Sequence, residues 1–278
     1  MHLRLWGTRG TIPTPEAENG RYGGNTPCIE VRSSEDDLLI LDAGIGLHWL
    51  GDELMMNSFG DGEGRGHILV SHTHWGHIQG IPFFRPMLIS GNRFSIYGTG
   101  GADSFKDLLL EQMASYYCPV PNFFDDSIGA LTRIEEIDER EFAIGSTRVT
   151  ARRVNHVPDV VTLGFRIEDA AGGSLAYIPD VEYLKQGHRD QTLELAAGVD
   201  MLIHDAHQTT DEYPARRGRG HSSVQDAIEI ARQAQARHLV LFHHHPDRSD
   251  SAIDDLLRSC DSVGLRVDAA REGAEYTL

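Results

Sequence analysis

The sequence predicts one α/β domain in which β-sheets are covered by helices. Two observations support this prediction: short apolar runs of the β type recur along the chain, and segments with helical periodicity lie between them. Several runs are continuously apolar, as expected of strands that are buried on both faces. The chain shows no linker, low-complexity tract or internal repeat, so we expect residues 1–278 to form a single domain.

Ten short runs rich in aliphatic and aromatic residues predict strands. In chain order they are residues 3–8, 28–33, 38–44, 67–72, 94–99, 142–154, 162–168, 174–180, 201–206 and 238–244. The glycine-rich segment FGDGEGRG, residues 59–66, predicts a flexible connection, and PVPNFFDD, residues 119–126, predicts an irregular loop.

Four segments between the strands predict helices: 102–115, 183–197, 222–236 and 251–260. The third has the clearest 3.6-residue period. Ser222 or Ser223 could cap this helix, with Gln225 or Asp226 in its first turn.

The charge balance excludes some classes of partner. A formal charge of −17 argues against proteins that grip a nucleic acid backbone, because such proteins neutralise several phosphates with clustered Lys and Arg. The best basic cluster, Arg216, Arg217 and Arg219, is too short to offset the rest of the chain. A small anionic substrate is compatible with this balance, because a bound metal can dominate the local field.

Cysteine content and apolar windows indicate a cytoplasmic protein. Cys28, Cys118 and Cys260 lie far apart and make an odd count, which argues against a disulfide framework and a cysteine-based zinc site. The N-terminus has no apolar stretch typical of a signal peptide, and no window is long enough for a membrane span. We therefore expect no membrane partner.

Histidines and an aspartate gather at the ends of the apolar runs, where neighbouring strands can bring their tips together. These candidate metal ligands are His72, His74, His77, His156, Asp180 and His243. Imidazole and carboxylate groups suit zinc, so the pattern predicts a metal site. The remaining five histidines outside the motifs are interpreted as surface or hydrogen-bonded core residues: His2, His48, His67, His188 and His238.

The segment HTHWGHIQGIPFF resembles the signature loop of the metallo-β-lactamase superfamily, whose usual form is HxHxDH. The resemblance covers nearly the whole chain, through WGTRGTIPTP, YGGNTPC, LLILDAGIG, NHVPDVVTLGFRIE, AYIPD, LIHDAH, GHSS and LVLFHHHP. More narrowly, the chain resembles the phosphodiesterase branch with tRNase Z and the small cyclic-nucleotide phosphodiesterases. This resemblance implies a four-layer αββα sandwich with the active site on one edge, between the two sheets.

The resemblance also implies a two-metal centre that clamps a phosphoryl group and lowers the pKa of a bridging water. The first metal would be held by His72, His74 and His156, the second by His77 and His243, with Asp180 bridging both. His244 and His245 adjoin His243, which we favour because it directly follows the apolar run. Zinc is the expected ion, with manganese or iron as alternatives.

Two further motifs imply catalytic residues. LIHDA resembles the His-Glu-Ala-Thr box of the branch, and GHSS resembles its His-Ser-Thr motif. By this resemblance His221 would donate a proton to the leaving alkoxide or contact the phosphoryl oxygens, and Asp205 would orient it. The alternative is that His221 only precedes a helix cap. His207 could support the site or lie at the surface.

Other residues have two open interpretations each. Asp42 could support the histidine loop or be a turn carboxylate. Asn25 and Thr26 could lie near the site or bond to local backbone. The aromatic residues after the 102–115 segment could form a lid that stacks a nucleobase, a dimer element or ordinary core: Tyr116, Tyr117, Phe123 and Phe124.

Gly76 departs from the family pattern, which has an aspartate ligand of the second metal at this position. Glycine supplies neither oxygen nor charge, so we expect weaker second-site affinity and slower turnover. The leading interpretation is a metal-dependent phosphodiesterase that cleaves a small phosphodiester such as a 3′,5′-cyclic nucleotide by metal-bound hydroxide. The alternatives are a non-catalytic metal- and nucleotide-binding protein and a tRNA 3′-processing nuclease. A homodimer is the default assembly.

Overall fold

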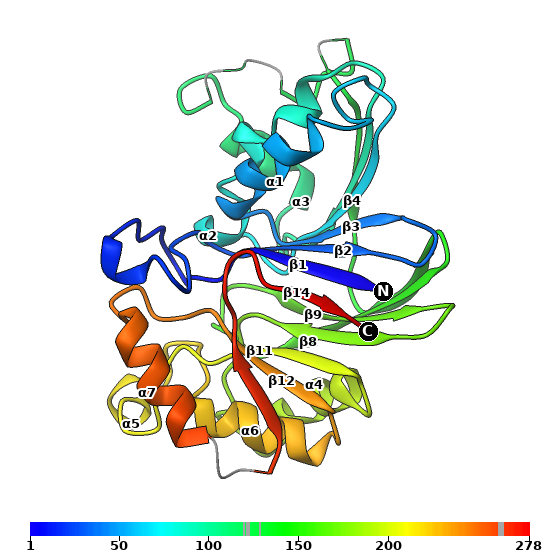
Figure 1. Cartoon of the computed structure of the whole chain (residues 1–278). Helices are drawn as coiled ribbons and strands as arrows, with labels where there is room; N and C mark the ends of the chain where they lie inside the picture. Colours follow the sequence, from blue (N-terminus) through cyan, green and yellow to red (C-terminus); the bar gives the residue numbers. More distant parts are fainter. Residues whose placement is uncertain (119, 121–122, 128, 261–263) are drawn as a thin grey trace.

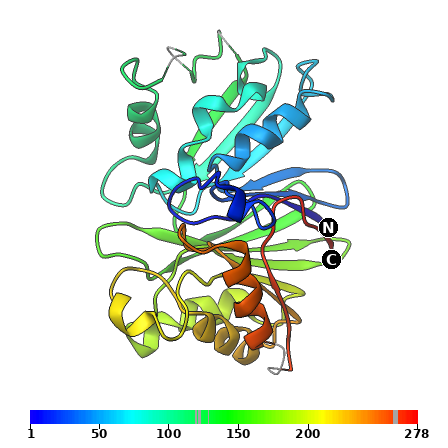
Figure 2. The same cartoon turned by 60° about the vertical axis from the view of Figure 1, so that its left-hand side comes forward.

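Two β-sheets face each other and helices cover both outer faces, in the computed structural model of the chain (Figures 1 and 2). The structure describes residues 1–118, 120, 123–127, 129–260 and 264–278. The layers are those of the predicted αββα sandwich, so the fold prediction is confirmed.

The first sheet has seven strands in the order β14–β1–β2–β3–β4–β5–β6. Its strands are β1 (His2–Gly7), β2 (Cys28–Arg32), β3 (Leu38–Leu41), β4 (Arg65–Leu69), β5 (Arg93–Gly98), β6 (Leu131–Glu136) and β14 (Glu275–Thr277). Strands β3 to β6 run parallel, and the other pairs are antiparallel. The C-terminal ends of β3 and β4 therefore lie at the same edge.

The second sheet has seven strands in the order β13–β12–β11–β10–β9–β8–β7. Its strands are β7 (Arg140–Ile144), β8 (Thr147–Val154), β9 (Thr162–Asp169), β10 (Ser174–Ile178), β11 (Met201–Asp205), β12 (His238–Phe242) and β13 (Arg266–Ala269). Strands β10 to β13 run parallel. Their C-terminal ends face the same edge of the sandwich as those of β3 and β4.

The helices divide between the two outer faces (Figure 1). On the first sheet lie α1 (Gly46–Leu54), α2 (Trp75–Ile78) and α3 (Phe105–Gln112). On the second lie α4 (Asp190–Ala196), α5 (Tyr213–Arg216), α6 (Val224–Gln233) and α7 (Asp250–Cys260). The 3-10 helices are η1 (Ala17–Asn19), η2 (Ile81–Phe83), η3 (Arg85–Leu88) and η4 (Gln186–His188). None of the helices in the described residues is long and apolar enough to cross a bilayer.

Every predicted strand is present, but the run 142–154 contains two strands rather than one. β7 and β8 pair as a hairpin, and Gly145 at φ +52° makes the turn between them. Three of the four predicted helices are shorter than expected: α3 and α4 begin only at Phe105 and Asp190, and α6 spans Val224–Gln233. The fourth agrees within one residue, since α7 begins at Asp250. The flexible connection 59–66 ends early, because β4 begins at Arg65. Of the predicted loop 119–126, residues 119, 121 and 122 lie outside the described residues.

The core explains the continuously apolar strands. One buried cluster fills the space between the sheets and includes Leu5, Val31, Phe165 and Phe242. Two further clusters lie under the helices on either outer face. Because each central strand contributes to a layer on both of its faces, its apolar residues are not confined to alternate positions.

Helix α6 begins at a capping box, which decides between the two predicted caps. The hydroxyl of Ser223 accepts from the backbone N–H of Asp226, and the Asp226 carboxylate accepts from the backbone N–H of Ser223. The hydroxyl of Ser222 instead donates to the carbonyl of Val181 at 2.6 Å. The start of α6 is thereby attached to the end of β10.

Candidate metal centre

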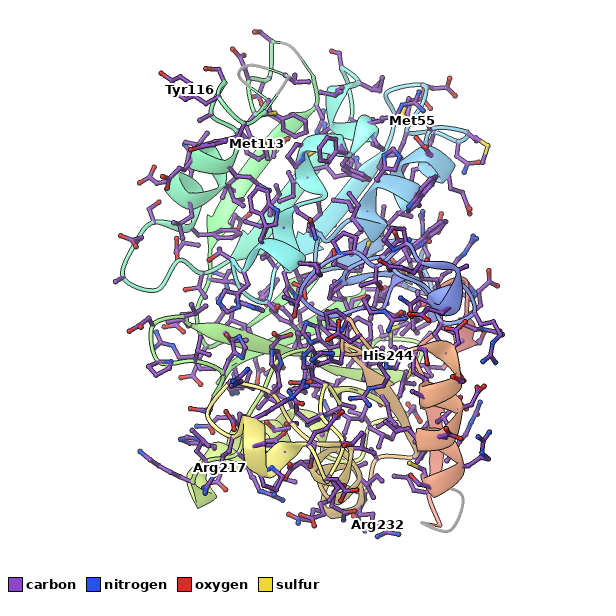
Figure 3. All side chains as sticks on the ribbon, turned by 90° about the vertical axis from the view of Figure 1, so that its left-hand side faces the viewer. Met55, Met113, Tyr116, Arg217, Arg232 and His244 are labelled. Carbon is purple, nitrogen blue, oxygen red and sulfur yellow. The ribbon has the colours of Figure 1, made fainter. Side chains whose placement is uncertain are left out.

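The candidate ligands come from loops that follow strands of both sheets. His72, His74 and His77 follow β4, His156 follows β8, Asp180 follows β10 and His243 follows β12. Figure 3 labels His244, the neighbour of His243, at mid-height between the two halves of the sandwich. The predicted convergence of distant segments is thus present.

Four ligand atoms form the first set. The Nδ1 atom of His74 lies 2.9 Å from Nε2 of His72 and 3.1 Å from Nε2 of His156. Asp180 Oδ2 lies 3.8 Å from the His72 nitrogen and 3.6 Å from the His156 nitrogen. A tetrahedral zinc ion with bonds of 2.0–2.1 Å separates its ligands by about 3.3 Å. The four atoms are therefore spaced to surround one ion.

The other oxygen of Asp180 belongs to the second set. Asp180 Oδ1 lies 3.3 Å from Nε2 of His77 and 3.3 Å from Nε2 of His243. The Asp180 carboxylate thus presents one oxygen to each set, as a bridging ligand would. His244 and His245 are in neither set, and Nε2 of His244 is bonded to the carbonyl oxygen of Ala270.

Hydrogen bonds orient the ligand nitrogens. Nδ1 of His156 donates to the carbonyl of Gly220 at 2.7 Å, and Nδ1 of His77 donates to Asp42 at 2.7 Å. The Ser71 hydroxyl donates to Asp42 and accepts from Nδ1 of His72. In these tautomers, assigned from the hydrogen bonds, each Nε2 atom is left with a free lone pair.

Burial keeps most of the imidazoles neutral, which is the form that binds metal. Desolvation lowers the pKa of His74 to about 4, and it lowers the pKa values of His72 and His243 well below the usual range. His77 differs. Desolvation lowers its pKa, but the charges of Asp180 and Asp42 outweigh burial and raise it to about 10.

Unsatisfied atoms show that these residues fit a cation. Asp180 Oδ1 and both ring nitrogens of His243 are buried and have no hydrogen-bond partner among the described residues. Buried polar groups without partners are costly, and a divalent ion would satisfy Asp180 Oδ1 together with Nε2 of His243. The nitrogen and oxygen donors are suitable ligands for zinc.

His221 and Asp205 form a pair beside the ligands. Nδ1 of His221 lies 3.1 Å from Oδ2 of Asp205, which is fully buried at the end of β11. Burial lowers the pKa of His221, but Asp205 and then Asp180 outweigh this and raise it to about 9. The protonated imidazole lies 3.8 Å from Asp180 and can donate a proton at the site.

A cavity of about 390 Å³ opens onto residues of both ligand sets and onto His221. Its lining includes His74, His77, Asp180, His221 and the exposed Arg219. Arg219 brings a permanent positive charge to the cavity, as the small-anion interpretation requires.

Glu182 holds the loop that carries Arg219 and His221, and the sequence analysis missed it. Its buried carboxylate accepts from the backbone N–H groups of Gly218 at 2.6 Å and Gly220 at 2.7 Å. A carboxylate two residues after the candidate ligand Asp180 was the available signal. Buried there, it needs donors that only the folded loop provides.

The other uncertain residues separate into two groups. Asp42 supports the histidine loop, since it also accepts from the backbone N–H of Ser71 and from the Tyr177 hydroxyl. Asn25 and Thr26 lie outside the ligand sets and the cavity lining, and they bond to distant segments rather than to local backbone: Asn25 donates to Glu272, and the Thr26 hydroxyl accepts from the backbone N–H of Ile45. The five histidines interpreted as ordinary lie outside the ligand sets.

His207 is buried at the site rather than at the surface. Its ring stacks on His221 with centroids 4.3 Å apart, and its Nδ1 donates to the carbonyl of His243 at 2.9 Å. His243 has a left-handed backbone at φ +58°. His207 therefore contacts both the proton donor and a backbone group of a candidate ligand.

Position 76 has no room for a side chain. A Cβ atom added to Gly76 would lie 2.8 Å from the carbonyl oxygen of Thr11, whose backbone is left-handed at φ +63°. An aspartate here would require the Thr11 loop to move. The backbone of a distant segment thus lies against the point where a side chain at position 76 would begin.

The fold and the paired ligand sets define a metallo-β-lactamase-fold metallohydrolase. The family model described as "Beta-lactamase superfamily domain" matches residues 39–244, so the chain belongs to this family.

Three known proteins illustrate the similarity. Ribonuclease BN of Escherichia coli O1:K1 is 25% identical over 324 positions that cover 100% of both chains. The crystal structure of human tRNase Z, short form, has a TM-score of 0.68 and 20% identity, covering 100% of this chain and 99% of that chain. Zn²⁺-bound PqqB of Methylobacterium extorquens has a TM-score of 0.69 and 17% identity, with 100% of both chains covered.

Proposed function

We propose that the protein is a metal-dependent phosphodiesterase that cleaves a small phosphodiester such as a 3′,5′-cyclic nucleotide. The observation that carries the proposal is one cavity lined by three features: two ligand sets sharing Asp180, His221 held by the buried Asp205, and Arg219. The volume of about 390 Å³ suits a small ligand.

The proposed cofactor is zinc in both sites, with manganese or iron as alternatives. His72, His74, His156 and Asp180 would hold one ion, and His77, Asp180 and His243 the other. When bound, two such ions supply Lewis acidity and an activated water to a phosphoryl group. The second site has no carboxylate at position 76 and is proposed to be the weaker one.

The residues of the chain have distinct proposed roles. Arg219 binds the non-bridging phosphoryl oxygens, because its guanidinium is always charged and matches phosphate geometry. His221 donates a proton to the leaving oxygen. Asp205 orients His221 through the bond to Nδ1, which leaves Nε2 as the nitrogen available to substrate.

A tRNA-processing ribonuclease is the second candidate, because the curated relatives are named Ribonuclease BN. The net charge of −17 opposes a long polyanion. In addition, the alignment spans 324 positions against 278 residues here, so those relatives contain segments without a counterpart in this chain.

A cytoplasmic location, a single domain and a homodimer are part of the proposal.

The test is a substrate panel on protein loaded with Zn²⁺ or Mn²⁺. The panel contains bis-p-nitrophenyl phosphate, 3′,5′-cyclic AMP and a precursor tRNA, with His221→Ala as the control. We expect both small diesters to be cleaved and the variant to lose at least about a hundredfold in kcat. Cleavage of the tRNA alone would favour the nuclease. Metal uptake and nucleotide binding without turnover of any diester would identify a binding protein.

A further inference from the structure

We infer that a groove beside the metal cavity binds the nucleobase of the substrate, a flat nitrogenous ring with an N–H donor. This inference rests on the proposed function, since it names the substrate class of the same site. The groove has a volume of about 490 Å³. Its walls include Trp75, Ile78, Leu108, Glu111, Gln112 and Tyr117.

The groove adjoins the metal cavity at Trp75. This side chain lines both spaces, and it directly follows the candidate ligand His74. Thr73, between His72 and His74, lines the groove as well. A phosphoryl group at the ligand sets would therefore place its attached nucleoside over Trp75.

Two exposed aromatic side chains make the groove suitable for a flat ring. Trp75 is 57% exposed and Tyr117 is 76% exposed, on opposite segments that border the groove. Ile78 and Leu108 supply an apolar floor. Aromatic rings left open to water in this way form stacking platforms for bases, whose affinity is largely independent of sequence.

The charges of the metal cavity and of the groove suit different parts of a nucleotide. The metal cavity contains Arg219 and His221, which attract phosphate. The charged side chain of the groove lining is Glu111, and among the described residues the lining includes no Lys, Arg or His. A phosphate would be repelled from the groove, whereas a ring with an N–H donor would be attracted.

Gln112 is a second indication of a ligand with donors. It is buried, its Nε2 atom donates to the carbonyl of Ile78 at 2.9 Å, and its Oε1 atom has no hydrogen-bond partner among the described residues. The groove lining thus combines an exposed acceptor, Glu111, with a buried and unpartnered amide oxygen of Gln112. An exocyclic amino group, as in adenine, matches such a wall.

The four aromatic residues with three open interpretations, Tyr116, Tyr117, Phe123 and Phe124, have different environments in the structure. Only Tyr117 of the four residues lines the groove, and Trp75 is the partner that the sequence analysis did not assign. Phe123 is buried and Phe124 packs against the core beneath α1 and α3. Tyr116 is 91% exposed and lies at the periphery of the molecule, away from His244 (Figure 3).

The test measures base-dependent binding without requiring turnover. Metal-loaded protein is titrated by calorimetry with AMP, with purine riboside 5′-monophosphate, which lacks the amino group, and with ribose 5-phosphate. We expect AMP to bind at least about tenfold more tightly than ribose 5-phosphate. Trp75→Ala and Tyr117→Ala should reduce this ratio toward one, and Tyr116→Ala, the matched control, should keep it.

The outcomes separate the groove from the phosphodiesterase proposal. Glu111→Gln should reduce the preference for AMP over the purine riboside monophosphate. An unchanged ratio in both Trp75→Ala and Tyr117→Ala, each with normal metal content, overturns the groove. A base-dependent ratio in a protein that cleaves no diester retains the groove and rejects the phosphodiesterase. Diester cleavage without a base-dependent binding ratio retains the phosphodiesterase proposal and rejects the groove.

Discussion

The Oδ2 atom of Asp205 lies 3.1 Å from Nδ1 of His221 and also accepts the backbone N–H of Val181, the residue after Asp180. The other oxygen of Asp205 accepts the backbone N–H of His207. One buried carboxylate therefore fixes the candidate proton donor and the strand end that carries the bridging ligand. Small errors in either position are costly in catalysis.

Replacing Asp205 by Asn is expected to lower kcat by roughly a hundredfold or more, while the protein stays folded. The pKa of His221 is raised to about 9, so its proton is present below this pH and is lost as pH rises through it. Without the Asp205 charge, burial moves the pKa down. The fall in kcat should therefore occur at lower pH in the variant, which a pH–rate profile measures.

Bound metal ions shift both profiles toward lower pH, because two dications oppose a third positive charge nearby. The alkaline fall in kcat is still expected at lower pH in Asp205→Asn than in the wild type. Identical alkaline limbs for the two proteins would show that His221 is not the titrating proton donor.

Removal of metal by a chelator is expected to lower Tm, because ions that bind only the folded state stabilise it. Titration back with Zn²⁺ should show two unequal affinities, the tighter one from the set that contains three imidazoles and Asp180. Calorimetry and metal analysis measure this. Two sites of equal affinity would contradict the weakening assigned to Gly76.

Gly76→Ala is expected to reduce the free energy of unfolding by about 1–3 kcal/mol, because its Cβ would press on the Thr11 carbonyl. Urea unfolding provides the measurement. Gly187→Ala is the matched control, since the nearest atom to its added Cβ is 3.8 Å away. Gly76→Asp should reduce the free energy of unfolding by a similar or greater amount. A Gly76→Asp protein that is both more stable and more active than the wild type would show that position 76 has room for a side chain.

Arg219→Ala is expected to raise KM for an anionic diester by about tenfold, with a smaller change in kcat, because Arg219 contributes charge rather than proton transfer. The loop carries a convenient control, Arg217→Ala, at an exposed residue outside the cavity lining. Steady-state kinetics on bis-p-nitrophenyl phosphate compares them. Equal KM values for both variants would remove Arg219 from substrate binding.

Glu212→Gln tests a support of the site. Burial raises the pKa of Glu212, but bonds from the Thr209 backbone and from Arg248 outweigh it and lower the pKa from 4.5 to about 2. Arg248 also donates to the carbonyl of His207 at 3.0 Å. A lowered carboxyl pKa stabilises the fold above about pH 4.5, and this contribution is lost as pH falls toward about 2.

The urea midpoint of unfolding should therefore be higher for the wild-type protein than for Glu212→Gln at neutral pH. This difference in midpoint should vanish in acid. Asp211→Asn, at an exposed neighbouring carboxylate, is the control. A difference between wild type and Glu212→Gln that stays constant down to strongly acidic pH would exclude a charge effect.

The sequence by itself determined the sandwich class, the strands with apolar runs and the candidate ligands. Burial on both faces leaves a local record in these runs, and His72, Asp180 and His243 lie within three residues of the strand ends. The sequence analysis missed strands that lack an apolar run. Strand β6 is one of them, because its alternating exposed residues depend on pairing with β5.

The tertiary structure alone decided how distant segments meet. It brings Thr11 against Gly76, His207 under His221, and Tyr117 to the groove that Trp75 shares with the metal cavity. None of these contacts leaves a periodic pattern in the chain. They are set by loop conformation and by the packing of one sheet on the other, whereas strand identity is set by the burial of neighbouring residues.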